Sequence, residues 1–320
     1  MSVEDGAVPV ARVVRSGVVE SVHLGHVALL GPDGHLRGCL GDPAATFFPR
    51  SSLKPVQAAA MLRAGLDLDD APLALACASH SGEPDHLDGV RRILHGAGRG
   101  EPDLQNTPAV PLDDEAAFVW RAAARPPSAT AQNCSGKHAA MLATCVAAGW
   151  DTATYRDPGH PLQLAIAEHV TTLTGDAVTH VGVDGCGAPL FSCTIGGLAR
   201  AFARIAVEPA GTPEGRVAAA IRAHPWWLGG TGRPVTRFLQ AVPGLVAKDG
   251  AEGVFAAALP DGRALAVKIL DGSPRPVPAV VAAALRRLGV DAPALDRLGR
   301  VDVLGHGTPV GRVEPVAFSA

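Results

Sequence analysis

The chain has 320 residues, of which 47% are hydrophobic, 18% charged and only 4% aromatic, and its net charge is -3. Such a chain is expected to fold around a sizeable core, with no reason to bind nucleic acid or an anionic membrane. No apolar run of about 18 residues predicts a membrane span. The first residues, MSVEDGAVPVARVV, lack the apolar stretch of a secretory signal, so we expect a cytoplasmic protein whose six cysteines are thiols.

Two hairpins are predicted, one near each end of the chain. Residues 18–41 read as two strands around the turn GPDG at 31–34. Residues 253–272 repeat the pattern around PDG at 260–262. Proline followed by Asp-Gly is strong turn chemistry. Hairpins of this kind at both ends predict one antiparallel sheet that the two ends build together.

The middle of the chain is predicted to be helical. Alanine-rich stretches that stop at a glycine, and stretches with helical spacing, indicate helices. Residues 99–130, rich in proline, aspartate and alanine, are expected to contain loop. The predicted fold class is α+β, with residues 1–320 as a single unit, a sheet from about 10–45 and 245–320, and a helical part from about 50–240. The individual helices are expected at 51–63, 137–148, 161–174, 213–223 and 279–288.

The first candidate for chemistry is the segment PRSSLKPVQAAAM at 49–61. Ser51 and Lys54 are three residues apart, so they share one helix face, whereas Ser52 points elsewhere. A serine hydroxyl needs an adjacent base to act as a nucleophile, and a buried lysine can be that base. The alternative is a serine at a helix N-terminus followed by an exposed lysine, and the spacing alone favours that alternative.

Three further segments place polar side chains beside apolar ones. LALACASHSGE at 73–83 ends a buried run in Ser-His-Ser-Gly-Glu, which is also typical of a capped turn before a helix. QNCSGKH at 132–138 and VDGCGAP at 183–189 each carry a cysteine beside glycine. Cys134 and Cys186 could share a zinc ion with a nitrogen or oxygen ligand added, although no Cys-x-x-Cys pair is present.

The sequence says less about the roles of the remaining cysteines and of two further lysines. Cys39, Cys77 and Cys145 are interpreted as small buried hydrophobes, and Cys193 is left open. Lysines also stand in the apolar strand LAVKIL at 265–270 and in LVAKDGAEG at 245–253. Each lysine points either to solvent or into a cleft, and alternation along a strand makes solvent the default.

Taken together, these segments resemble the asparaginase II family of the rhizobial type. The resemblance runs through most of the chain and keeps its order. It includes ESVHLGHVALL, RSSLKPVQA, CASHSGE, NCSGKH, VDGCGAP and LVAKDGAEGVF. The family is similar in fold to serine β-lactamases and glutaminases. This agrees with a sheet built from both ends, so a serine β-lactamase-like fold is expected.

The resemblance also implies catalytic roles. Ser51 would be the nucleophile and Lys54 its base. Ser79 and Lys268 would form a second serine–lysine pair across the cleft, which relays protons to the leaving amine. The second motif is Ser-His-Ser rather than the Ser-Asp-Asn of β-lactamases, and Lys268 is followed by Ile-Leu rather than Thr-Gly. A penicillin-type substrate is therefore poorly supported.

Binding roles follow from the same resemblance. Cys134, Lys137 and Cys186 would bind zinc near the substrate, which requires a neutral lysine. Arg50 and Asp184 would hold the carboxylate and amino ends of L-asparagine, and a homodimer is expected.

The predicted function is hydrolysis of the side-chain amide of L-asparagine to L-aspartate and ammonia through a serine acyl-enzyme. One alternative is a glutaminase or another serine hydrolase of the same fold. The other is a non-catalytic zinc-containing binding protein. The sequence does not choose between asparagine and glutamine.

Overall fold

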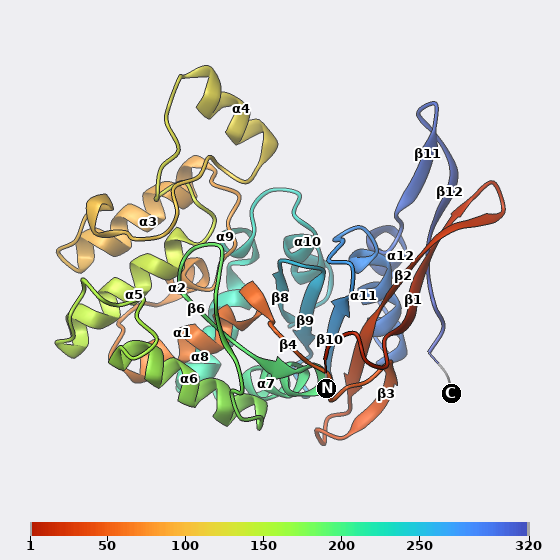
Figure 1. The fold of residues 1–320 in the computed structure, drawn as a ribbon, viewed down its shortest axis with the longest axis horizontal. Helices are drawn as coiled ribbons and strands as arrows, with labels where there is room; N and C mark the ends of the chain where they lie inside the picture. The colour runs from red at the N-terminus through yellow and green to blue at the C-terminus, as the bar shows by residue number, and fades with distance from the viewer. Residues whose placement is uncertain (1, 319–320) are drawn as a thin grey trace.

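The predicted α+β class, with an antiparallel sheet built from both ends of the chain, is confirmed by a computed structural model that describes residues 2–318. Figure 1 shows the sheet on one side of the molecule and most of the helices on the other. The strands of the large sheet are β1 (Val8–Arg15), β2 (Val18–Leu30), β3 (Leu36–Leu40), β8 (Val246–Gly250), β9 (Val254–Ala258), β10 (Ala264–Ile269), β11 (Asp302–Gly305) and β12 (Thr308–Pro315).

The strand order explains how the two ends of the chain meet. The sheet runs β11-β12-β1-β2-β10-β9-β8, with β3 also paired to β2, and its pairs are antiparallel. Both predicted hairpins are present as β2–β3 and β9–β10, and they join through β2 and β10. Strand β8 follows the last helix of the middle region and takes the end of this order.

The helical region occupies the middle of the chain, as expected. Its helices are α1 (Lys54–Arg63), α2 (Asp70–Ala76), α3 (Pro84–Gly96), α4 (Asp114–Ala122), α5 (Ser135–Ala148), α6 (Pro161–Thr174), α7 (Ile195–Val207), α8 (Pro213–Ala223), α9 (Pro225–Leu228) and α10 (Pro234–Ala241). Two helices, α11 (Val277–Arg287) and α12 (Ala294–Leu298), lie between β10 and β11 in the chain. Two short pairs complete the middle: β4 (Thr46–Phe47) with β7 (Cys193–Thr194), and β5 (Val181–Val183) with β6 (Pro189–Phe191).

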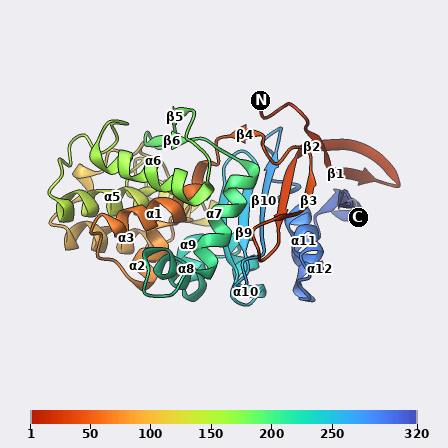
Figure 2. The same ribbon diagram turned by 90° about the horizontal axis from the view of Figure 1, so that it is seen from below.

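Helix α7 is the central element between the sheet and the other helices. It packs against β2, β9 and β10 on one side and against α6 and α8 on the other. Helices α11 and α12 lie on the opposite face of the sheet, as Figure 2 shows. Among residues 2–318, no helix combines the length and the apolar character that crossing a membrane requires.

Three local features differ from the sequence prediction. The helix expected from residue 51 begins as a 3-10 turn, Arg50–Leu53, and the α-helix starts only at Lys54; Arg50 has a left-handed backbone with φ of 55°. The stretch 99–130, expected to contain loop, also carries α4, which starts where the Asp113 side chain accepts a hydrogen bond from the Ala116 backbone. Helix α7 was not predicted, because two glycines in its first turn hide its pattern.

The packing of α7 against the sheet generates a stability prediction. Phe202 is fully buried on this helix, so Phe202→Ala should lower the free energy of unfolding by about 3–5 kcal/mol, through lost burial and a residual cavity. Denaturant unfolding measures the change. Phe118→Ala is the control, since that side chain is 71% exposed and should change stability by no more than about 0.5 kcal/mol. Equal effects in the two variants would contradict the placement of α7 in the core.

Candidate active site

The first element of the site is the turn that carries Ser51. The 3-10 turn leads directly into α1, and the Lys54 backbone N–H donates to the Ser51 carbonyl. Residues three apart in a 3-10 turn lie one above the other, so Ser51 and Lys54 lie on the same side of this turn. Within residues 2–318 the Ser51 hydroxyl has no hydrogen-bond partner, while Ser52 is buried and its hydroxyl donates to the Lys248 carbonyl at 3.4 Å.

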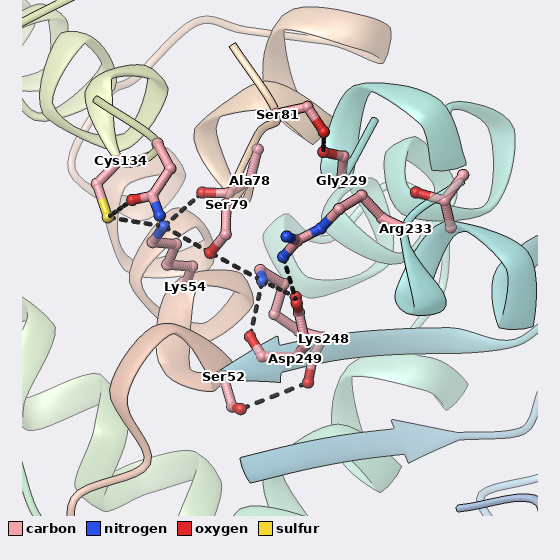
Figure 3. A network of polar contacts seen from close by, with 12 residues as sticks. Ser52, Lys54, Ala78, Ser79, Ser81, Cys134, Gly229, Arg233, Lys248 and Asp249 are labelled. Atoms are coloured by element: carbon pink, nitrogen blue, oxygen red, sulfur yellow. Dashed lines mark hydrogen bonds and ion pairs between the residues drawn. The ribbon is translucent and has the colours of Figure 1, made fainter. Parts of the chain in front are cut away.

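Lys54 is buried, as expected for a base rather than a surface charge. Its amine lies against the Ala78 carbonyl, 3.1 Å from the Ser79 hydroxyl and 3.1 Å from the Cys134 sulfur. Ser79 follows α2, so the first two sequence motifs meet here (Figure 3). The direct contact of Lys54 is with Ser79 and not with Ser51.

The second lysine that contacts Ser79 is Lys248. The predicted contact between Lys268 and Ser79 is not present. The Lys248 amine lies 3.0 Å from the Ser79 hydroxyl, from the side opposite Lys54 (Figure 3). The Lys268 amine instead donates to the backbone carbonyls of Glu252 and Ile269, at 2.6 and 2.8 Å. The physical reason is strand order, because β10 lies inside the sheet and β8 packs beside the turn that carries Ser51.

Lys248 also contacts its neighbour in sequence. Its amine donates to the Asp249 carbonyl at 2.7 Å and pairs with the Asp249 carboxylate, which Arg233 also binds at 3.1 Å. Burial lowers the pKa of Lys248 to about 8, although the adjacent Asp249 carboxylate acts in the opposite direction. Burial would raise the pKa of Asp249, but Lys248 and Arg233 outweigh burial and bring it to about 2.

The chain contains only four lysines against 24 arginines. All four are buried, with exposed fractions of 1% for Lys54, 2% for Lys137, 0% for Lys248 and 7% for Lys268. Lysines are rarely buried without a partner, so each of these has a specific role in structure or chemistry. This scarcity is the signal in the sequence that could have drawn attention to Lys248 on equal terms with Lys268.

Arg50 and Asp184, predicted to hold the substrate, lie side by side. The Arg50 guanidinium binds the Asp184 carboxylate at 2.9 Å and lies 3.8 Å from Glu252. Burial would raise the pKa of Asp184, but the charges of Lys137 and Arg50 hold it below its ordinary value. Arg50 also lines a groove of about 610 Å³ with Phe48, Lys268 and other residues. Adjacent opposite charges beside a groove suit a zwitterionic amino acid.

The three predicted zinc ligands also come together. Cys134 and Cys186 are buried in one small cluster, and the Lys137 amine lies 3.3 Å from the Cys186 sulfur. A hydrogen bond between the two thiols lowers the pKa of Cys134 and raises that of Cys186. Burial disfavours the charged form of Lys137, but the sulfurs and Asp184 outweigh it and raise its pKa.

Two sulfurs and one nitrogen fit the donor set that zinc prefers, provided that Lys137 loses its proton. In the described part of the chain, no three His, Cys, Asp or Glu side chains are grouped as metal ligands. The candidate set differs from such groups because its third donor is a lysine.

His80 links the second and third motifs. Its Nε2 lies 2.8 Å from the Ser135 hydroxyl, which donates to the Thr130 carbonyl at 2.7 Å, so Nε2 carries the proton. Burial lowers the pKa of His80 and keeps the ring neutral. The ring therefore fixes the start of α5 beside Ser79, a role that the sequence did not reveal.

The family model described as L-asparaginase II matches residues 11–315. No curated protein matches. A β-lactamase structure from Mycobacterium bovis is 17% identical over 83% of this chain and 95% of its own, with a TM-score of 0.46. Mglu in its native form is 17% identical over 83% of this chain and 64% of its own, with a TM-score of 0.44.

Proposed function

Because the chain belongs to the L-asparaginase II family, we propose that it hydrolyses the side-chain amide of L-asparagine through an acyl-enzyme on Ser51. The observation that carries the proposal is the Ser79 hydroxyl, held between the buried amines of Lys54 and Lys248 beside the turn of Ser51. Two amines around one hydroxyl provide a path for the protons that amide cleavage must move.

The proposed reaction begins with attack of the Ser51 oxygen on the amide carbon while Lys54 takes the hydroxyl proton. Catalytic hydrogen bonds often close only when substrate is bound, and the stacked positions of the two residues allow this contact. The Ser51 backbone N–H, in the first turn and free of an intrahelical acceptor, helps to stabilise the oxyanion.

Ammonia then leaves with a proton that passes from Lys248 through Ser79. Water attacks the acyl-enzyme, its proton returns to Lys248 by the same path, and Ser51 recovers its proton from Lys54. Free aspartate and the starting enzyme result, so the protons balance over the cycle.

Substrate selection is assigned to the charged pair beside the groove. Arg50 binds the α-carboxylate and Asp184 the α-ammonium group of asparagine, which replaces part of their mutual ion pair. Zinc, when bound by Cys134, Lys137 and Cys186, would hold these three side chains together and supply a Lewis-acidic centre near the substrate. The proposed enzyme is a homodimer. This part of the proposal rests on the family resemblance, and light scattering tests it.

The main competing function is that of a glutaminase or another serine hydrolase. Glutamine is one methylene longer, and a tight pocket distinguishes one methylene by about 1–3 kcal/mol. A coupled assay of ammonia release from asparagine and from glutamine tests the proposal. Faster release from asparagine supports it, faster release from glutamine replaces it with a glutaminase, and no release from either supports a binding protein.

The first prediction concerns the nucleophile. Ser51→Ala should reduce turnover by about 10³-fold or more, as loss of a covalent nucleophile does in other serine hydrolases. Ser52→Ala is the matched control, since that hydroxyl makes only one long hydrogen bond to a carbonyl. Near-normal turnover in a folded Ser51→Ala variant, together with an inactive Ser79→Ala variant, would transfer the nucleophile to Ser79.

The second prediction separates the two strand lysines. Lys248→Met should lower turnover by about 100-fold or more, because it removes a proton donor at Ser79. Lys268→Met should leave turnover nearly unchanged and cost about 1–3 kcal/mol of stability, because two backbone carbonyls lose their donor. Steady-state kinetics and denaturant unfolding check both variants, and the reverse pattern would restore Lys268 to the proposed mechanism.

The third prediction concerns zinc. The wild-type protein should retain zinc after dialysis, and Cys186→Ser should lose it and bind asparagine more weakly, because a hydroxyl is a poor zinc ligand. Cys145→Ser is the control, since Cys145 is a buried thiol of α5 outside the cluster. Metal content by mass spectrometry gives the answer, and equal zinc in all three proteins would exclude the proposed ligand set.

A further inference from the structure

The contacts of the Lys248 amine account for every proton of an ammonium group. An ammonium has three N–H donors and no acceptor. Around Lys248 there are three acceptors: the Ser79 hydroxyl at 3.0 Å, the Asp249 carbonyl at 2.7 Å and the Asp249 carboxylate. Because the side chain is fully buried, the protein itself supplies these acceptors. The arrangement therefore matches a protonated lysine.

The Asp249 carboxylate is itself held in place. One of its oxygens pairs with Lys248, and the other accepts a hydrogen bond from the Arg233 guanidinium at 3.1 Å. Arg233 precedes α10, so the carboxylate is fixed between β8 and the start of this helix (Figure 3). A carboxylate bound on both oxygens cannot rotate away without losing one of its partners.

We propose that Asp249, held by Arg233, is a positioning residue that keeps Lys248 as an ammonium directed at Ser79, and thereby makes Lys248 the proton source for the leaving amine. The inference rests on the proposed function, since the leaving amine belongs to that reaction. The proton leaves the Lys248 nitrogen for the Ser79 oxygen, and the proton of the Ser79 hydroxyl passes to the nitrogen of the leaving group. Lys248 is then neutral until water returns a proton in the second half of the cycle.

The charges around Lys248 show why the carboxylate is needed. Burial favours loss of its proton, and so do the positive charge of Arg233 before α10 and that of Lys54 from α1 whenever Lys54 holds a proton. Cys77 at the end of α2 is a neutral thiol, because burial raises its pKa to about 12. Among residues 2–318, Asp249 is the one acidic side chain in contact with the amine. Asp249 therefore favours the protonated form of Lys248, whereas burial and the neighbouring positive charges favour loss of its proton.

The expected sign of the pH effect follows from this balance. The pKa of Lys248 is already lowered to about 8 with Asp249 present. Without the carboxylate, nothing offsets burial and the charge of Arg233, so the pKa of Lys248 falls further. The ammonium form would then be lost as the pH rises through a value below 8, and the proton donor would be missing at neutral pH.

The small number of lysines makes a direct test possible. Protein labelled with ¹³C at lysine Cε should give four signals, each assigned by its loss in the corresponding Lys→Arg variant. In the wild type the Lys248 signal should titrate near pH 8, and in Asp249→Asn its midpoint should fall by at least about one pH unit. Asp249→Glu should restore most of the shift.

A matched control lies at the other strand lysine. Asp271 is an acid near Lys268 and does not contact Lys248. Asp271→Asn should move the Lys268 signal and leave that of Lys248 in place. An unchanged Lys248 midpoint in Asp249→Asn would overturn the proposal. If that variant does not fold, the wild type still decides, because a Lys248 amine that is already neutral at pH 6 also overturns it.

Kinetics separate a positioning role from a merely structural one. In Asp249→Asn the basic limb of the kcat profile should move to lower pH together with the Lys248 signal, with KM changed by no more than about threefold. A lower kcat with an unmoved pH profile would overturn the proposal. A wild type that cleaves no amide, but in which Lys248 titrates as described, would refute the proposed function and leave the role of Asp249 in holding the ammonium supported.

Discussion

The structure depends on keeping two amines buried around one hydroxyl. Lys54 and Lys248 approach Ser79 from opposite sides, with almost no exposure to water. A buried amine is costly unless each of its hydrogen-bonding groups is matched. The start of α1, the end of α2 and strand β8 must therefore meet in one arrangement. This requirement couples the helical region to the sheet more specifically than apolar packing alone would.

The chain topology places strand β8, which carries Lys248, beside the first turns of the helical region. Strand β8 is last in the sheet order, and it packs against the turn of Ser51. The segment after β8 turns at Glu252, whose backbone has a positive φ of 60° like that of Arg50. Non-glycine residues in this conformation are strained and are frequent near functional sites. Both strained residues line the same groove, and their side chains lie 3.8 Å apart.

Local pattern predicted much of the fold and only part of the site. Helices α6 and α8 match the expected residues because glycine or proline marks their ends, and both hairpins follow from their Pro-Asp-Gly turns. The error at Lys268 has a different origin. Both strand lysines stand in apolar sequence, and which one reaches Ser79 depends on strand order, which local pattern does not contain. The contact of Asp249 with Arg233 is hidden for the same reason.

The polar segments that looked like separate candidates in the sequence form one network. Cys134 contacts Lys54, and Lys137 contacts Cys186 and influences Asp184, which pairs with Arg50 beside Ser51. A change of charge at Cys134 or Cys186 therefore alters the electrostatic potential at the proposed base, Lys54, and at the proposed substrate-binding pair of Arg50 and Asp184. Because the lysines and thiols are buried and the Arg50–Asp184 pair is partly buried, water screens such changes weakly. The lysine amines, the thiols and the acid–arginine pair must therefore be treated as a single electrostatic unit, in which Asp249 and Asp184 provide the negative charge that keeps the buried cations in place.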